Sequence, residues 1–212
     1  MIPGRPTATQ ETGSSPGRPG KVELHLAGDA RADALLSRDP LALLVGMVLD
    51  QQVPLERAFS APAALATRIG GLDAAAIASM DPQQLGAAFA AKPALHRYPG
   101  SMATRVQALC RLIVDEHGGR PESIWTSART GTELLARVRR LPGFGDQKAR
   151  IFVALIGKQL GVRPQGWQEA CRPFGDPGTR MSVADITGPE SLAEVRAYKQ
   201  VLKAKARKGE QR

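Results

Sequence analysis

Aromatic residues are scarce in this 212-residue sequence, at 4% of the chain. Sheet-rich folds depend on aromatic and β-branched side chains, so this scarcity, together with abundant Ala and Leu, indicates an all-α protein. Only two cysteines are present, Cys110 and Cys171. Two cysteines are too few for a disulfide framework, a four-cysteine metal site or an iron–sulfur cluster. We therefore expect both thiols to be reduced and buried.

Long apolar segments are also missing. The longest apolar run, residues 41–49, is much shorter than the roughly 20 residues that a membrane-spanning helix needs. No apolar targeting segment opens the chain, which begins with Pro, Gly, Ser, Thr and Arg residues. The three histidines, His25, His96 and His117, have no spacing typical of metal ligands, so no catalytic metal is predicted.

Positive charge is plentiful and unevenly distributed. The chain has 29 Lys and Arg residues against 20 Asp and Glu, which gives a net charge of +9. Seven basic residues and one acidic residue lie in residues 196–212, so six of the nine net charges belong to this end. Such a charge favours nucleic acid or another anionic surface as a partner, and we expect the basic end to add salt-sensitive affinity that does not depend on sequence.

Helix start and stop signals divide most of the chain. Residues 1–20 are of low complexity and predict a disordered tail, and a helical pattern begins near Lys21. Predicted helix starts are Asp39-Pro40, Pro54, Asp81-Pro82, Pro99, Thr130 or Thr132, and Pro189. The first of these helices, predicted through Gln52, is apolar nearly all round and should be buried. Residues 163–178 are rich in Pro and Gly and predict loops or short turns.

The most informative segment reads LPGFGDQKA, at residues 141–149. Gly143 and Gly145 can take positive φ, which permits a tight hairpin before a helix that begins at Gly145-Asp146. Unpaired N–H groups at that helix start would form a seat for an anion such as a DNA phosphate, reinforced by Lys148 and Arg150. The alternative is a tight turn between two helices that binds no ligand.

This segment resembles the helix-hairpin-helix of the HhH-GPD superfamily of DNA glycosylases, where the pattern is L-P-G-h-G-x-x-[T/V]-A. Residues 40–53, ending in Leu-Asp-Gln-Gln-Val, resemble a family helix that ends in L-x-Q-Q-[VIT]. Residues 101–113 resemble the helix that packs across the two lobes of that fold. The resemblance implies an all-α, two-lobed glycosylase-like domain over residues 21–190, followed by a C-terminal helix and basic tail over residues 191–212.

The resemblance assigns DNA-contacting roles to both matched segments. In the hairpin, the phosphate-binding residues are Gly143, Phe144, Gly145, Gln147 and Lys148. The same hairpin implies a structural monovalent cation held by backbone carbonyls, and no other cofactor and no iron–sulfur cluster are expected. Gln51 and Gln52 match the position that fills the gap left by a flipped nucleotide or contacts the orphaned base. Ordinary polar residues at a helix end are the alternative explanation for these two glutamines.

Two catalytic residues of the family are missing from the matching positions of this sequence. Relatives with lyase activity carry a Schiff-base lysine at the position of Gln147, and Gln147 cannot act as an amine nucleophile. The catalytic Asp of the family is missing from its expected window, residues 163–170, where Gln168 takes its position and Glu169 lies beside it. Three alternatives remain open: Glu169 replaces the Asp, Gln168 positions water as a neutral group, or the site is inactive. Glu169 is also typical of a solvated first-turn acid.

Two aromatic residues are candidates for the base pocket. Trp167 lies beside the catalytic window and is the better candidate for stacking on an extruded base, and Tyr98, near His96, is a candidate for the rim. Either aromatic can instead be a packing residue.

We therefore expect a monomeric, cytoplasmic, nucleoid-associated DNA repair hydrolase that binds duplex DNA and flips a damaged or mismatched base. As a monofunctional glycosylase, it would hydrolyse the N-glycosidic bond of that base in base excision repair. One alternative is a catalytically inactive protein of the same fold that binds DNA or senses lesions. Another is an unrelated helical interaction domain.

Overall fold

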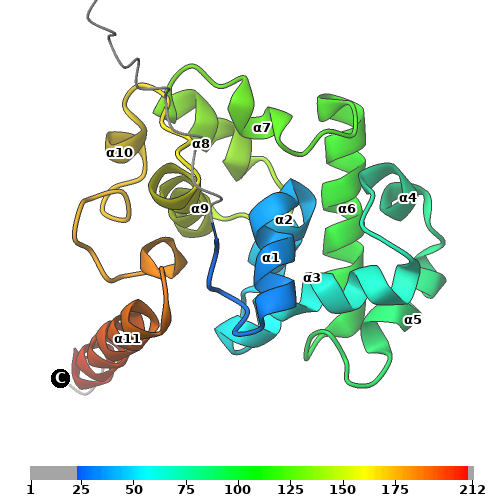
Figure 1. Cartoon of the computed structure of the whole chain (residues 1–212), viewed down its shortest axis with the longest axis horizontal. Coiled ribbons are helices and arrows are strands. Elements are labelled where there is room, and N and C mark those ends of the chain that lie inside the picture. The colour runs from blue at the N-terminus through cyan, green and yellow to red at the C-terminus, as the bar shows by residue number, and fades with distance from the viewer. Residues whose placement is uncertain (1–22, 210–212) are drawn as a thin grey trace, which may run out of the picture.

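The computed structural model describes residues 23–209, and its regular structure is helical throughout that range (Figure 1). No strand forms there, and a single isolated bridge joins Thr130 to Gln165. The predicted all-α class is confirmed. The predicted disordered tail, residues 1–20, lies outside the described residues. In residues 23–209, no helix is both long enough and apolar enough to cross a membrane.

The helices follow one another closely along the chain. Their bounds are α1 Ala30–Arg38, α2 Pro40–Leu49, α3 Leu55–Ile69, α4 Ala74–Ser79, α5 Pro82–Ala90, α6 Pro99–His117, α7 Ser123–Thr126, α8 Gly131–Arg139, α9 Asp146–Gln159, α10 Trp167–Ala170, the 3-10 helix η1 Val183–Asp185 and α11 Pro189–Gly209.

The helices pack in two groups. Helices α1 to α6 contact one another, with α4 and α5 lying along α6, while α8 and α10 pack on α9 and η1 joins α9 to α11. Figure 1 shows α3 to α6 on one side, α8 to α10 on the other, and α1 and α2 between them. One cluster of buried apolar side chains includes residues of both groups. Helix α2 is therefore placed where the two groups meet.

Helix α1 begins later than the helical pattern near Lys21 predicts. Ahead of it, Leu24 and Leu26 are both buried, two residues apart, as in an extended chain. The buried Asp33 carboxylate accepts hydrogen bonds from the backbone N–H groups of Leu26 (2.8 Å) and Ala27 (2.7 Å). These bonds satisfy the two backbone donors without a helix, so a side chain of the following helix α1 stabilises an extended segment where the pattern predicts helix.

Helix α2 starts as predicted and ends sooner. The Asp39 carboxylate accepts hydrogen bonds from Leu41 N (2.9 Å) and Ala42 N (3.2 Å), and every residue after the first proline is buried. The helix ends at Leu49 instead of continuing through Gln52. Gln52 has φ of 55°, in the left-handed region, which a continuing α-helix cannot contain.

Most other predicted ends are confirmed. Asp81 caps α5, and Thr130, one of the two candidates, caps α8 by accepting from Glu133 N (3.2 Å). Gly70 and Gly118 end α3 and α6 with φ of 84° and 58°. Helices α4 and α7 were not predicted, because six and four residues are too short to show helical periodicity.

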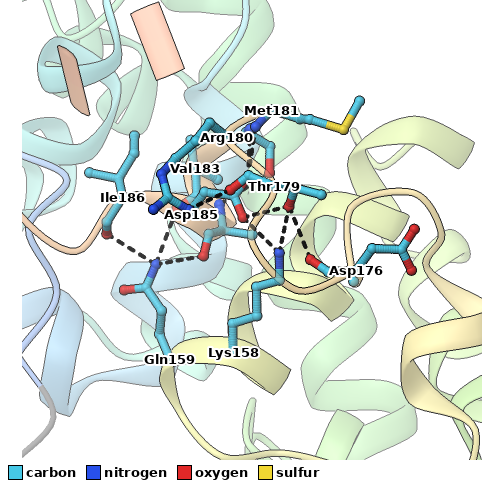
Figure 2. Close-up of polar contacts among 12 residues, drawn as sticks. Lys158, Gln159, Asp176, Thr179, Arg180, Met181, Val183, Asp185 and Ile186 are labelled. Carbon is cyan, nitrogen blue, oxygen red and sulfur yellow. Dashed lines mark hydrogen bonds and ion pairs between the residues drawn. The ribbon is translucent and has the colours of Figure 1, made fainter. Parts of the chain in front are cut away.

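A buried polar network holds the chain that follows α9 (Figure 2). Lys158 Nζ lies 2.6 Å from Asp185 Oδ1 and 2.8 Å from Thr179 Oγ1, and the Asp185 side chain is only 2% exposed. Gln159 Nε2 donates to three backbone carbonyls, those of Val183, Ala184 and Ile186. The last turn of α9 thus fixes η1, and η1 in turn positions the start of α11.

Candidate functional site

The hairpin between α8 and α9 is built around two glycines with different roles. Gly143 has φ of +86°, and a Cβ there would lie 3.5 Å from the Val48 side chain on α2. Gly145 has an ordinary φ of −73°, contrary to the expectation of positive φ, but no atom lies within 4 Å of the place a Cβ would occupy. Its lack of a side chain leaves the backbone open to close approach. Phe144 is buried between them and packs edge-on against Phe152.

The first turn of α9 is open to an outside acceptor. The helix begins at Asp146, and no side chain caps it, so its leading N–H groups have no capping partner. Asp146 itself is exposed and forms ion pairs with Arg139 and with Arg150 (2.9 Å). The hydrogen bond from Arg150, together with Arg139, lowers the pKa of Asp146. The positive charges of these two guanidinium groups thus offset the negative charge of the Asp146 carboxylate beside the helix start.

Backbone carbonyls of the hairpin are the groups that would hold the monovalent cation implied by the resemblance. Those of Pro142, Gly143 and Phe144 accept no hydrogen bond from any described residue. Carbonyl oxygens are the hard ligands that such ions take. A cation bound there would add positive charge beside a phosphate on the first turn of α9.

Lys148 is oriented differently from the expectation that it faces a phosphate. Its Nζ lies 2.6 Å from the carbonyl oxygen of Met47 and 3.3 Å from that of Val48, both at the end of α2. Burial lowers the pKa of Lys148, the negative charge of Asp50 raises it, and Arg105 lowers it. An ammonium satisfies the last carbonyls of a helix well, which explains why Lys148 turns inward and connects α9 to α2.

Beside this connection lies a pocket of about 410 Å³. It is lined by Met47, Asp50, Gly145, Asp146, Gln147, Lys148 and Ile151. The Asp50 carboxylate is half-buried, and no hydrogen bond from a described residue reaches it. Burial raises the pKa of Asp50, while the nearby charges of Lys199 and Lys148 oppose this rise.

Sequence reasoning did not single out Asp50 as a site residue. The only signal in the sequence was its place directly before the Gln51-Gln52 pair. That place does not reveal that the residue shares a pocket with the hairpin 95 residues later, because the contact between α2 and α9 is tertiary.

The two glutamines that follow have separate environments. Gln51 is half-buried, and its amide is fully engaged: Nε2 donates to Val48 O (2.7 Å) and Oε1 accepts from Arg105 (2.8 Å). Gln52 is exposed, and it is the one non-glycine residue in the described chain with positive φ. A left-handed conformation is unfavourable for a side chain with Cβ, so the turn holds Gln52 outward against a local cost.

His96 fixes this turn from the other side. It is 1% exposed, and its Nδ1 accepts a hydrogen bond from Tyr98 N (3.1 Å). Its Nε2 therefore carries the proton and donates to the carbonyl oxygen of Gln51 (2.9 Å). Tyr98 is 45% exposed under the Arg97 guanidinium and is not among the residues that line the pocket.

Trp167 lies away from this pocket. Its ring packs against Gly157 on α9, where an added Cβ would come within 2.4 Å of ring carbons, and its backbone packs against Gly131. Gly157 is three turns beyond Asp146, which is roughly 16 Å along the helix. The structure therefore gives Trp167 the packing environment that was its alternative explanation, away from the pocket lined by Asp50 and the hairpin.

Gln168 and Glu169 also fall outside the pocket lining. Gln168 Nε2 contacts the carbonyl oxygen of Gly175 at 3.5 Å, and Glu169 is exposed on the short helix α10. Cys110 and Cys171 are both free and buried, and burial raises the pKa of their thiols to about 12 and about 11.

The site thus consists of three neighbouring parts. They are the uncapped start of α9 in the glycine hairpin, the pocket lined by Asp50, and the turn of Gln51 and Gln52, called the Gln turn below. A family model described as HhH-GPD superfamily base excision DNA repair protein matches residues 45–208. The chain belongs to the HhH-GPD superfamily. A search among curated proteins finds no match. The matched range includes α2 from Val45 onward, the Gln turn, the hairpin and most of α11, so every feature of the HhH-GPD site described above lies within it.

Proposed function

We propose that this base excision DNA repair protein is a monofunctional DNA glycosylase. It binds duplex DNA through the hairpin, flips a damaged or mismatched base and hydrolyses the N-glycosidic bond of that base. The observation that carries the proposal is the adjacency of the open α9 start and a pocket of about 410 Å³ with a carboxylate in it. A phosphate on the hairpin would bring the neighbouring nucleotide to this pocket.

Gln52 supports the flipping step. Its side chain is exposed and its backbone is held in a conformation that directs it outward, so it suits insertion into a base stack. An inserted amide both fills the space of an extruded nucleotide and hydrogen-bonds to the orphaned base.

Two observations favour water as the nucleophile. Gln147 lines the pocket at the position of the Schiff-base lysine and offers no amine, and the Lys148 ammonium donates to two carbonyls of α2. The test is single-turnover release of free base from duplexes that carry uracil, alkylated or oxidised bases, with sodium borohydride added in parallel reactions. We expect base release without a covalent protein–DNA adduct. Adduct formation would show a lysine mechanism instead.

One observation favours the second candidate, a lesion-binding protein without activity. The only carboxylate in the window where relatives keep their Asp is Glu169, and it is exposed outside the pocket lining. Binding of lesion-bearing duplex in preference to intact duplex, with no base released from any substrate, would support this candidate over the glycosylase.

A further inference from the structure

We propose that Asp50, in the turn after α2, is the catalytic carboxylate of this protein and faces water and the sugar C1′ of the flipped nucleotide. This assignment rests on the proposed glycosylase function. It places the carboxylate in the part of the chain that precedes the hairpin, whereas Glu169 on α10 follows the hairpin.

The first argument is position. Asp50 lines the same pocket as Gly145 and Gln147, which belong to the anion-binding turn. It also immediately precedes the turn that presents Gln52. A nucleotide whose phosphate sits on the first turn of α9, and whose place in the stack is taken by Gln52, would have its sugar between these two points.

The second argument is that Asp50 has no structural partner. A carboxylate with a structural role is normally hydrogen-bonded, as the buried Asp33 is by the N–H groups of Leu26 and Ala27, whereas Asp50 is only half-buried. Asp50 receives no such bond from the described residues, although the cationic groups of Lys148 and Lys199 are near. An unpaired carboxylate that opens into a pocket is available to a substrate.

The third argument comes from the contrast with Asp146, the other carboxylate of the pocket. Asp146 is exposed and bonded to two arginines, which lower its pKa, whereas burial raises the pKa of Asp50. Two carboxylates in one site with opposite shifts have different tasks. Asp146 remains ionised as part of the hairpin, and Asp50 is the stronger base.

The step balances with water as the only co-reactant. Asp50 takes one proton from water as the water oxygen bonds to C1′. The C1′–N bond breaks, and its electron pair leaves with the base. The proton on Asp50 then passes through solvent to the base nitrogen, which regenerates the carboxylate. While the bond is breaking, the carboxylate also stabilises positive charge on the sugar.

The test compares three variants under single-turnover conditions on a duplex that the wild-type protein processes. We expect Asp50→Asn to slow base release by about 100-fold or more. Asp115→Asn, a matched change at an exposed position of α6, should stay within about twofold of wild type. Glu169→Gln should do the same. A rate for Asp50→Asn within about threefold of wild type, or a large loss in Glu169→Gln instead, would overturn the assignment.

A binding measurement separates this assignment from the proposed function. Two duplexes are compared, one with a cationic pyrrolidine at an abasic position and one with an uncharged tetrahydrofuran there. We expect wild-type protein to prefer the pyrrolidine duplex by about tenfold or more, and Asp50→Asn to lose that preference. Equal preference in both proteins would refute the role of Asp50. Absence of base release by wild-type protein, with the Asp50-dependent preference intact, would refute the glycosylase activity and the catalytic step, and would leave Asp50 only as the group that faces the sugar of the flipped nucleotide.

Discussion

Lys148 Nζ lies 2.6 Å from the carbonyl oxygen of Met47, a residue 101 positions earlier in the chain. This bond connects the first turn of the hairpin helix to the last turn of α2. It thereby joins the two segments that identify the family, the LPGFG hairpin and the Gln-Gln turn. The pocket that contains Asp50 lies at the same junction, with Met47 and Asp50 from the end of α2 and Gly145 to Lys148 from the start of α9 in its lining.

Replacing Lys148 by Met should weaken this connection. The ammonium bonds to two carbonyls, so we expect a loss of about 2 kcal/mol in the free energy of unfolding, measured with urea. Arg120→Met, at an exposed cation, is the matched control and should change stability by less than about 0.5 kcal/mol.

Lys148→Met should also change the pH profile of base release. The charge of Lys148 opposes the rise in the pKa of Asp50, so its removal should move the acid limb of the profile to higher pH. A profile that keeps its acid limb in place while stability falls would show that Lys148 has only a structural role.

The difference in stability between Asp50→Asn and wild type should grow as the pH rises. Because the pKa of Asp50 is raised on folding, the protonated form is favoured in the folded state, and ionisation at higher pH costs stability. The groups that face Asp50 are Lys148, Lys199 and Asp146.

We therefore expect Asp50→Asn to melt at a higher temperature than wild type at about pH 7. The difference should shrink as the pH falls toward the ordinary Asp pKa of 3.8. Calorimetry over this range measures it. A variant that melts lower than wild type at neutral pH would indicate that the carboxylate stabilises the fold, contrary to the expected combination of lost activity and gained stability.

Substitutions of the two glutamines should have opposite consequences. Gln52→Gly relieves a left-handed conformation, so the fold should be as stable as wild type or more stable by about 1 kcal/mol. Base release should nevertheless fall by about tenfold, because the inserting side chain is lost.

Gln51→Ala removes the hydrogen bonds to Val48 and Arg105 and should destabilise the fold by about 1 to 2 kcal/mol. Urea melts and single-turnover rates on the same preparations distinguish the two residues. If Gln52→Gly processed its substrate at the wild-type rate, the inserting role would not hold.

Asp185→Asn should be among the more damaging single changes. It leaves Lys158 without its partner in a region where the Asp185 side chain is 2% exposed, so we expect a loss of about 3 kcal/mol. The control is Asp176→Asn in the exposed pair with Arg172, which should cost less than about 1 kcal/mol. Equal effects of the two changes would mean that the network in Figure 2 does not stabilise the end of α9.

Truncation after Leu202 should change the salt dependence of DNA binding. Five basic residues and one acidic residue follow Leu202. We expect the slope of log K against log salt to become shallower by between about 2 and 4, with preference for the lesion unchanged. Fluorescence anisotropy on matched duplexes, with and without the lesion, measures both quantities. An unchanged slope would exclude these residues from DNA contact.

The sequence could predict elements whose signals are local. Asp-Pro starts, glycine stops and the apolar run of α2 follow from capping and periodicity, which operate within a few residues. The hairpin was recognisable for the same reason, since its glycines and the following helix form a contiguous pattern. Where the local pattern misled, as before α1, the buried Asp33 side chain of the following helix had taken over the backbone hydrogen bonds of Leu26 and Ala27.

The sequence by itself determined the helical class, the family and the position of the hairpin for which phosphate binding is proposed. Tertiary structure decided which of the candidate site residues lie at the pocket beside the hairpin and which have packing or structural roles. It packed Trp167 against Gly157, turned Lys148 toward α2, separated Gln51 from Gln52 and placed Asp50 in the pocket of the hairpin. The physical reason is that desolvation and hydrogen-bond partners depend on segments far apart in the chain. A residue's neighbours in sequence do not reveal which carboxylate will lie half-buried in a pocket with no hydrogen bond from a described residue.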